Sequence, residues 1–338
     1  MHDQPQTLRV PAADMLAAFA RILRKHGFTN DRAAACAQLF TDNSVDGVYT
    51  HGVNRFPRFV KYVQEGFVRP DATPVRKGGF GGLEQWDGRL GPGPLNAVDA
   101  TDRAMQLAAG HGIGCVALAN TNHWMRGGAY GWQAAKAGFV FIGWTNTIAN
   151  MPAWGARDSR LGNNPLIFAL PYQGEAIVLD AAMSQYSFGA MEMAQLKGQQ
   201  LSTWGGYDKN GRLTTDPAAV LETRRPLPIG YWKGAGMALL LDLLATILSG
   251  GLSTMEISTK AVEYGLSQVF IAIDLSKLDN RAAIPAALET IVNDYRQSVP
   301  EGDKRITYPG ERVLQTRRDN LANGIPVLSR VWGEIEAL

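Results

Sequence analysis

The stretch "GCVALANTNHWMRGGAYGWQAAKAGFVFIGWTN", residues 114–146, combines two kinds of pattern. Its ends, residues 114–119 and 139–146, are short apolar runs that predict strands, and residues 128–138 between them predict a helix. A polar loop that ends in two glycines joins the first strand to the helix. A strand, a helix and a second strand in this order are typical of an α/β protein with a central sheet.

The alternation continues toward the C-terminus. Glycine and proline punctuate it, and the lengths of the apolar runs separate strands from helices. Strands are predicted at 165–171, 175–180 and 267–275, and helices at 188–198, 233–249, 280–297, 310–323 and 327–337. The helix over 233–249 is apolar on nearly every side, so we expect it to be buried.

Toward the N-terminus the pattern becomes helical. Apolar residues at helical spacing predict helices at 14–26, 31–45, 53–65 and 95–110. Pro57 is tolerated only in a first helical turn, which indicates a helix that begins just after His51. Residues 70–96 are rich in glycine and proline, and we interpret them as a crossing between domains that contains short strands.

Together these patterns predict the domain organisation. Residues 76–265 form a sheet-containing domain, and residues 1–75 and 266–338 pack together as a largely helical domain built from both termini. The expected fold class is α/β, and 338 residues are enough to bury a sizeable core.

Composition limits the partners. The net charge is only +2 and the sequence has no Lys/Arg runs. We therefore expect that the protein does not bind nucleic acid. Cys36 and Cys115 are too few for a disulfide framework and indicate a reducing compartment. The N-terminus lacks the pattern of a signal peptide. Asp242 interrupts the longest apolar run, so we expect no membrane span. A soluble cytoplasmic protein is therefore predicted.

No standard nucleotide motif is present. A dinucleotide fingerprint needs G-x-G-x-x-G directly between a strand and a helix. "GPGPLN" at 91–96 and "GAGMAL" at 234–239 both lack the last glycine. The sequence therefore gives no support for a Rossmann domain.

Polar side chains instead gather in loops at the predicted strand and helix ends. His51 and Arg55 lie near the start of one helix; Asn122, His123 and Arg126 follow the strand at 114–119; Thr145 ends the next strand. Such loops are where α/β folds bind ligands. Arginine can hold a carboxylate with two hydrogen bonds, and histidine can exchange a proton near neutral pH. The set suits a small carboxylate or polyhydroxy substrate.

Other interpretations of these residues stay open. Each histidine could be a packed structural residue, and Arg55 could pair with a surface carboxylate. His51, His123 and a carboxylate could bind zinc, but no H-x-x-x-H or H-E-x-x-H spacing is present, so we expect no metal.

Several motifs together resemble one family. They are "GVYTHGVNRFPRFVKYVQEG", "EQWDG", "NHWMRGGAYGWQAAKAG", "GWTNTIANMPAWGA", "RLGNNPLIFALP", "VLDAAMS" and "IGYWKGAGMALLLDLLATILSGG". In this order, from about residue 14 to 338, the chain resembles the malate/L-lactate dehydrogenase family, whose fold is not Rossmann. "EQWD" and "NHWMRGG" favour a branch that reduces a 2,3-diketo sugar acid over the malate, ureidoglycolate and cyclic-imine branches.

The resemblance implies an NAD(P)H-dependent reductase that is cytoplasmic and homodimeric, with a mixed-sheet cofactor domain. It assigns the family's acid/base to His51. Many relatives have serine before this histidine, whereas Thr50 stands here and keeps the hydroxyl. The residues that the resemblance assigns to the cofactor are Ala176, Ile177, Val178, Leu179, Asp180, Ala181, Ala182, Trp232, Lys233, Gly310, Glu311 and Arg312.

The resulting hypothesis is hydride transfer from NADH to a 2,3-diketo acid, without a metal and with His51 as proton donor. Arg55, expected on the same helix face, would hold the substrate carboxylate. His123 would act from the sheet domain, with Asn122, Arg126 and Thr145 binding substrate. Use of NADPH stays open, as do a malate- or lactate-type 2-hydroxy acid dehydrogenase and an inactive binding protein.

Overall fold

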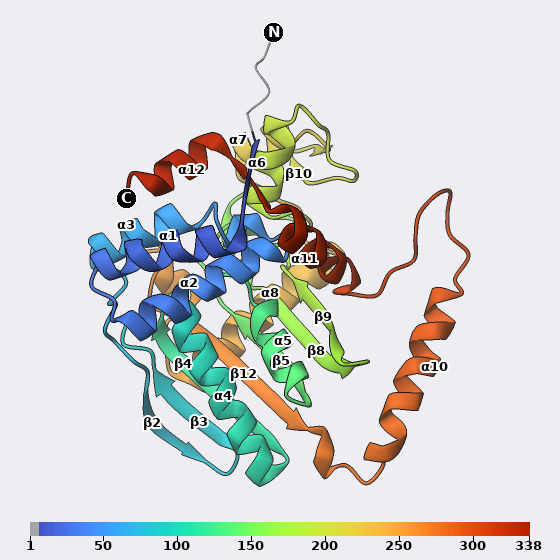
Figure 1. Ribbon diagram of the computed structural model, residues 1–338. Coiled ribbons are helices and arrows are strands. Elements are labelled where there is room, and N and C mark those ends of the chain that lie inside the picture. Colours follow the sequence, from blue (N-terminus) through green and yellow to red (C-terminus); the bar gives the residue numbers. More distant parts are fainter. Residues whose placement is uncertain (1–6) are drawn as a thin grey trace.

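A seven-stranded mixed sheet forms the centre of the protein. The computed structural model describes residues 7–338, so residues 1–6 of the predicted N-terminal range lie outside the described residues (Figure 1). The strand order is β2-β3-β4-β12-β5-β8-β9. β3 and β4 are parallel, and the other neighbouring pairs are antiparallel. This is not the doubly wound parallel sheet of a Rossmann fold.

The elements follow the predicted alternation closely. The strands are β1 Thr7–Val10, β2 Val75–Phe80, β3 Leu83–Asp87, β4 Ile113–Thr121, β5 Phe139–Thr145, β6 Met151–Pro152, β7 Ser159–Leu161, β8 Leu166–Tyr172, β9 Glu175–Ala181, β10 Gly206–Tyr207, β11 Leu213–Thr214, β12 Leu266–Asp274 and β13 Ile325–Leu328. The helices are α1 Ala12–Lys25, α2 Asn30–Val45, α3 Phe56–Gln64, α4 Gly93–His111, α5 Gly128–Lys136, α6 Phe188–Leu196, α7 Pro217–Thr223, α8 Trp232–Ser249, α9 Thr254–Ile257, α10 Ile284–Arg296, α11 Glu311–Asn323 and α12 Ser329–Glu336.

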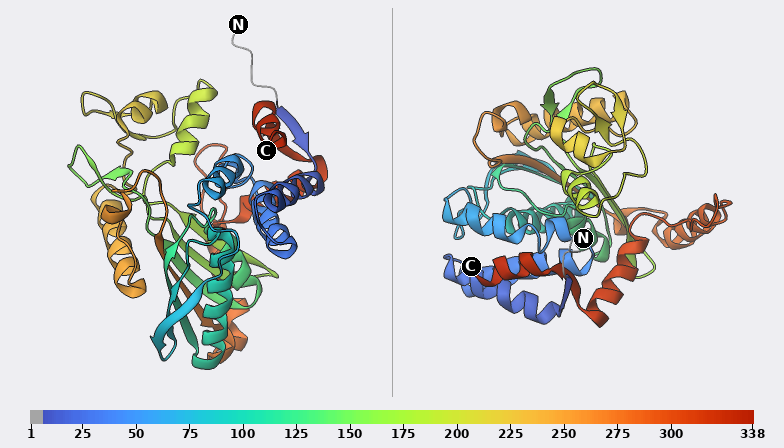
Figure 2. Two further views of the ribbon diagram at one scale, coloured as in Figure 1. Left: turned by 90° about the vertical axis from the view of Figure 1, so that its left-hand side faces the viewer. Right: turned by 90° about the horizontal axis from the view of Figure 1, so that it is seen from above.

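Helices cover the two faces of the sheet unequally. α4 and α5 pack on one face over a core that includes Trp124, Phe141 and Phe270. α8 packs on the other face, where Ala238, Leu241 and Ala245 meet the strands. The left view of Figure 2 shows the sheet between these layers. Alternation along each strand supplies the apolar residues for both faces.

The two ends of the chain lie side by side. β1 pairs with β13 in an antiparallel arrangement, with Leu8 opposite Val327. Ile325, Val327 and Ile335 from the C-terminus share one core with the apolar residues of α1, α2 and α3. The division of the chain into domains at 75/76 and 265/266 stays a prediction.

Two segments that were predicted to contain strands belong to the central sheet. β12, residues 266–274, falls in the range grouped with the terminal helices, but it lies between β4 and β5. β2 and β3, in the predicted crossing, form one edge of the sheet, with β3 beside β4. Pairing across such long sequence separations leaves no trace in local patterns.

The prediction that the helix over 233–249 is buried is wrong for one side of α8. The residues that it exposes by 40–67 % of their surface are Trp232, Met237, Leu239, Leu240, Leu243, Leu244 and Ile247. By length and composition Trp232–Ser249 could cross a membrane, with 33 % of that window buried. Asp242, however, accepts hydrogen bonds from Asn146 Nδ2 (2.9 Å) and the Thr254 amide (2.8 Å). α8 is thus a core helix with one uncovered side.

Candidate active site

His51 lies in a short loop between two N-terminal helices. α2 ends at Val45, and Tyr49–His51 form one 3-10 turn (η1) before α3 begins at Phe56. Gly52 must be a glycine, because a Cβ there would lie 2.2 Å from Ser44 Oγ. The Ser44 hydroxyl also accepts the amide of Val53 at 2.8 Å. The loop is therefore held tightly against α2.

The His51 ring is held at one nitrogen. The Thr50 hydroxyl lies 3.1 Å from His51 Nδ1, and Asn43 Nδ2 donates to the His51 carbonyl at 3.1 Å. When Thr50 donates to Nδ1, the proton of the neutral ring is on Nε2. The side chain is half-buried, so Nε2 is the nitrogen that a ligand can reach.

Arg55 and His51 do not share a helix face as the sequence suggested. His51 belongs to η1, and Arg55 is the N-terminal cap of α3, after a turn in which the Arg55 amide donates to the Gly52 carbonyl at 3.0 Å. Within residues 7–338 the Arg55 guanidinium makes no hydrogen bond or ion pair, so its donors are available. Burial, above all, lowers the pKa of Arg55, but a guanidinium stays charged at neutral pH.

His123 meets His51 from the sheet. It follows β4, and its Nδ1 accepts the amide of Met125 at 2.9 Å, so the neutral ring carries its proton on Nε2. The His51 and His123 rings stack, with centroids 5.5 Å apart and planes inclined by 26°. The two histidines that the sequence singled out therefore form one cluster.

Both imidazoles are neutral at pH 7. Burial first, and then the positive charges of Arg55 and Arg126, lower the pKa of His51 to about 4. The pKa of His123 also lies well below its usual value, because of burial first and then the charges of Arg55, His51 and Arg58. An anion bound beside these arginines would oppose their effect and favour a protonated His51.

A small cavity lies next to the histidines. Arg55, Arg58, Asn122, His123 and Glu263 are among its lining residues. Two guanidinium groups and two imidazoles can recognise a carboxylate and exchange a proton with a neighbouring oxygen.

The predicted substrate-binding side chains of Asn122, Thr145 and Arg126 have protein partners. Asn122 Nδ2 lies within 3.1 Å of three backbone carbonyls, those of Phe67, Leu90 and Gly91. Thr145 Oγ1 donates to the Asn146 carbonyl at 2.9 Å. Arg126 forms a buried ion pair with Asp46. Their roles in substrate binding stay predictions, since each has donors engaged in holding the fold.

Two of the three predicted cofactor segments meet at β9, and the third follows a contact just past its end. The first, residues 176–182, is β9 itself and the residue after it. The Val178 amide donates to the Pro309 carbonyl at 3.0 Å, which brings residues 310–312 alongside. Beyond the other end of β9, the Ile229 amide donates to the Met183 carbonyl at 2.9 Å, three residues before Trp232. Segments far apart in sequence thus meet along one strand.

Some side chains in these segments have protein partners, and others are exposed to solvent. Asp180 Oδ2 accepts the amide of Gly128 at 2.7 Å. Glu311 pairs with Arg296 and Arg305 at 3.1 and 2.9 Å. Trp232 and Lys233 are exposed at the start of α8, and the Lys233 ammonium lies 5.9 Å from the Trp232 ring. Trp232 and Lys233 are therefore accessible to a ligand.

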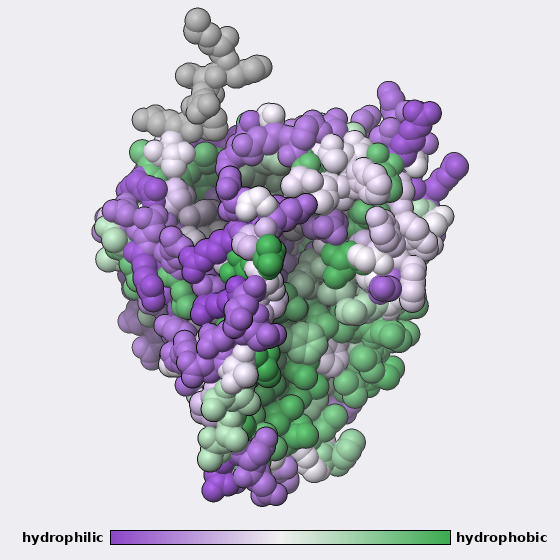
Figure 3. Space-filling view, turned by 90° about the vertical axis from the view of Figure 1, so that its right-hand side faces the viewer, coloured by the Kyte–Doolittle hydropathy of each residue, from purple (hydrophilic) through white to green (hydrophobic). Residues whose placement is uncertain are grey.

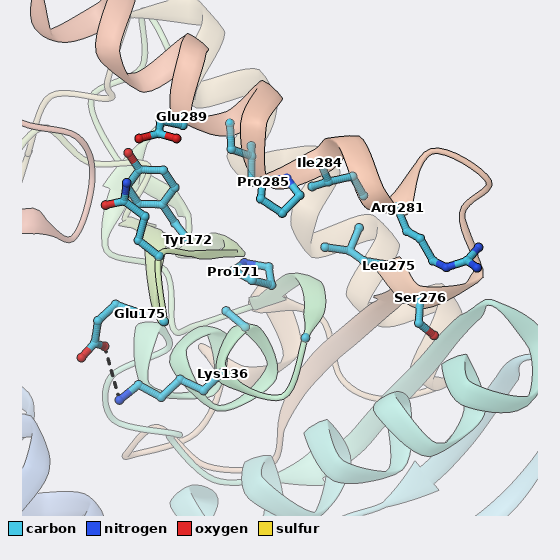
Figure 4. Close-up of a pocket in the computed structure, with 15 residues that line it drawn as sticks. Lys136, Pro171, Tyr172, Glu175, Leu275, Ser276, Arg281, Ile284, Pro285 and Glu289 are labelled. Atoms are coloured by element: carbon cyan, nitrogen blue, oxygen red, sulfur yellow. Dashed lines mark ion pairs between the residues drawn. The ribbon is translucent and has the colours of Figure 1, made fainter.

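A second, larger cavity lies away from the histidines. A space of about 430 Å³ separates α10 from the β8–β9 turn, with apolar residues such as Pro171, Ile284 and Leu288 along it (Figure 4). Its ion pair joins Lys136 to Glu175 at 3.4 Å. None of the predicted site residues lines it. Among the described residues no group of three His, Cys, Asp or Glu side chains is placed to hold a metal ion.

Sequence reasoning did not select Arg58, Asp46 or Arg317. Arg58 follows Arg55 by three positions, so helical spacing could have indicated that it would flank the same cavity. Asp46 and Arg317 are 271 positions apart and joined by an ion pair. No local signal could have revealed that contact.

Comparisons with known proteins identify the family of the chain. The family model described as malate/L-lactate dehydrogenase matches residues 10–336. The chain is 46% identical over 334 residues to 2,3-diketo-L-gulonate reductase of Escherichia coli K12, covering 98% of this chain and all (100%) of that protein.

Two solved structures are also similar. Malate dehydrogenase from Pyrococcus horikoshii has a TM-score of 0.87 at 26% identity, over 97% of this chain and 93% of that one. Malate dehydrogenase from Entamoeba histolytica has a TM-score of 0.92 at 22% identity, over 98% and 97%, which supports the fold alone. Dehydrogenases of this family use NAD(P)H. The chain is thus a soluble oxidoreductase that belongs to the malate/L-lactate dehydrogenase family.

Proposed function

We propose that the protein reduces 2,3-diketo-L-gulonate to 3-keto-L-gulonate with NADH in the cytoplasm. The observation that carries the proposal is identity of 46% over full length to a 2,3-diketo-L-gulonate reductase. The cluster of His51, His123, Arg55 and Arg58 supports it chemically, because the product differs from the substrate by one hydride and one proton. A sugar acid also offers a carboxylate to the arginines.

In this proposal His51 is the proton donor. In the protonated ring that the reaction needs, Nδ1–H donates to the Thr50 hydroxyl at 3.1 Å, and Nε2 directs its proton at the carbonyl oxygen on which negative charge develops, leaving a neutral ring after transfer. The carboxylate of the substrate lies against Arg55, which fixes the carbonyl beside Nε2. His123, with its proton on Nε2, donates a second hydrogen bond to the substrate. Bound NADH supplies the hydride for the carbonyl carbon.

The residues along β9 fit a dinucleotide. A Cβ at Gly310, which has φ +93°, would lie 3.2 Å from the Val178 amide nitrogen, so glycine permits close packing of the two cofactor segments. The exposed Lys233 ammonium and the positive end of the α8 helix dipole favour a phosphate. Trp232, 64% exposed, offers a ring face. NADPH is the alternative cofactor.

A substrate panel tests the proposal. We expect oxidation of NADH, followed at 340 nm, to be fastest with 2,3-diketo-L-gulonate and slower with pyruvate and oxaloacetate. Faster turnover of oxaloacetate or pyruvate would instead establish the second candidate, a malate- or lactate-type dehydrogenase. Repeating the panel with NADPH measures the cofactor preference.

Arg55→Lys is expected to raise KM for the keto acid by about tenfold and to leave the Kd for NADH unchanged. Lysine keeps the charge but cannot form the two parallel hydrogen bonds of a guanidinium. Steady-state kinetics and a fluorescence titration of NADH provide the two values. The matched control is Arg24→Lys on α1, which lies outside the cluster. An unchanged KM in Arg55→Lys would remove Arg55 from the substrate site.

We also propose that the protein is a homodimer formed through an apolar face, defined here as the seven exposed residues of α8 together with Phe168 and Leu179 of the adjoining strands. The apolar surface in Figure 3 supports this choice. Taking about 200 Å² for a fully exposed large side chain, the face offers on the order of 900 Å². A standard interface buries about 800 Å² per partner, and monomers rarely expose patches of this size.

A further inference from the structure

A buried cluster of charges joins three parts of the protein behind the two histidines. Asp46, 7% exposed, is the residue after α2 and comes five positions before His51. Its carboxylate accepts Arg317 Nε at 2.6 Å and Arg317 Nη2 at 3.0 Å, and it also accepts Nη1 of Arg126. Arg126 comes three positions after His123. One carboxylate thus connects both histidine-bearing loops to α11.

α11 holds the His51 loop through further contacts. Asn320 Nδ2 donates to the Val45 carbonyl at 2.9 Å and to the Tyr49 hydroxyl at 3.1 Å. Gly47 lies so close to Thr316 that a Cβ would approach its methyl group to 2.7 Å. Because α11 begins at Glu311, directly after Gly310, the same helix carries the third predicted cofactor segment.

The cluster also reaches β9. Gly128 is wedged between Asp180 and Arg126, since a Cβ there would lie 3.1 Å from Asp180 Oδ2 and 3.4 Å from Arg126 Nε. Asp46 thus pairs with both Arg126 and Arg317, and Asp180 lies near Arg126. Arg317 is further fixed over the Trp132 ring, 4.8 Å from its centroid. Charges this well paired hold their elements in one relative position.

We propose that Asp46 and Arg126 are positioning residues, which fix His51 against His123 and against the cofactor strand without touching the substrate. This inference rests on the proposed function of His51 as proton donor. It replaces the expectation that Arg126 binds substrate, because the guanidinium faces Asp46. A displacement of about 1 Å at reacting groups can cost about 100-fold in rate.

The first test is Asp46→Asn, which keeps the shape of the side chain and removes its charge. We expect kcat to fall about 100-fold, with KM for the keto acid changed less than about threefold. Asp46→Glu should recover part of the loss, since the charge returns. The matched control is Asp31→Asn, at the exposed first turn of α2; its kcat should equal that of the wild type.

The second test is a double-mutant cycle with Arg126→Gln. If Asp46 and Arg126 act through their ion pair, the fold-loss of kcat in the Asp46→Asn, Arg126→Gln double variant should be much smaller than the product of the two single fold-losses. A rise in KM alone for Arg126→Gln would restore it to the substrate site, and independent losses would overturn the proposal. If Asp46→Asn does not fold, Arg317→Lys takes its place, because Arg317 is partly exposed and lysine keeps the charge.

A measurement that does not depend on catalytic turnover separates the positioning proposal from the proposal that His51 is the proton donor. NMR titration of the histidine rings should place His51 in the wild type near pH 4. Arg126→Gln removes one positive charge that acts on the ring, so the midpoint should rise. If His51→Gln keeps full activity while this midpoint moves, the proposed function fails and the positioning contact survives. A midpoint unchanged in Arg126→Gln contradicts the positioning contact itself.

Discussion

The His51→Gln variant is expected to lose about 10²- to 10⁴-fold in kcat, the usual contribution of a positioned general acid. Glutamine is close in size and is polar, so the fold and the Kd for NADH should not change. His111→Gln, at the exposed end of α4, is the matched control and should behave as the wild type. A folded His51→Gln enzyme that loses less than about tenfold would show that another group donates the proton.

The dependence on pH provides a second check of the same role. Reduction needs protonated His51, and above its pKa of about 4 the protonated fraction of the free protein falls tenfold per pH unit. kcat/KM should therefore fall as pH rises. The bound carboxylate favours the protonated ring, so the midpoint in kcat should lie at higher pH than the midpoint in kcat/KM. His51→Gln should remove both dependences.

Two charges on the apolar face are expected to abolish the dimer. Leu240→Glu with Ile247→Glu places carboxylates at positions that are 58% and 67% exposed in the single chain. Burying an unpaired carboxylate in an interface costs several kcal/mol, which weakens association by more than about 10³-fold. Light scattering after gel filtration should give the monomer mass for the variant and the dimer mass for the wild type.

A matched control separates the apolar face from general surface hydrophobicity. Phe80→Glu lies in the β2–β3 hairpin at the opposite edge of the sheet and is 78% exposed, so it should leave the dimer intact. A dimer that persists in the Leu240→Glu, Ile247→Glu variant would place the interface on another surface. A monomeric wild type would refute the homodimer itself.

Much of the local structure could be predicted from the sequence, because periodicity is a local property. The predicted ends of the strand at 114–119 and of the helix at 128–138 each lie within two residues of the observed ends of β4 and α5. The pairing of β12 with β4 could not be predicted, because it joins residues about 150 positions apart, such as Val116 and Phe270. The same limit hid the contact of Asp46 with Arg317.

For the candidate site too, some features could be predicted from the sequence and others could not. His51 and His123 could be selected because their chemistry is rare in this chain, and the structure brings their rings together. Burial in the folded chain is the main cause that lowers the pKa of His51, followed by the charges of Arg55 and of Arg126, which arrives from another element. The prediction that the helix at 233–249 is buried was wrong for one side, because an apolar sequence does not indicate which other elements cover the helix.

The central place of β12 has a consequence for how the chain is made. β4 and β5 are not paired with each other, and their shared partner, residues 266–274, leaves the ribosome about 120 residues after β5. At roughly 5–20 residues per second, the two strands wait several seconds with unpaired edges. Open strand edges recruit other chains. We therefore expect a nascent chain that ends or stalls before residue 274 to aggregate through the unpaired edges of β4 and β5.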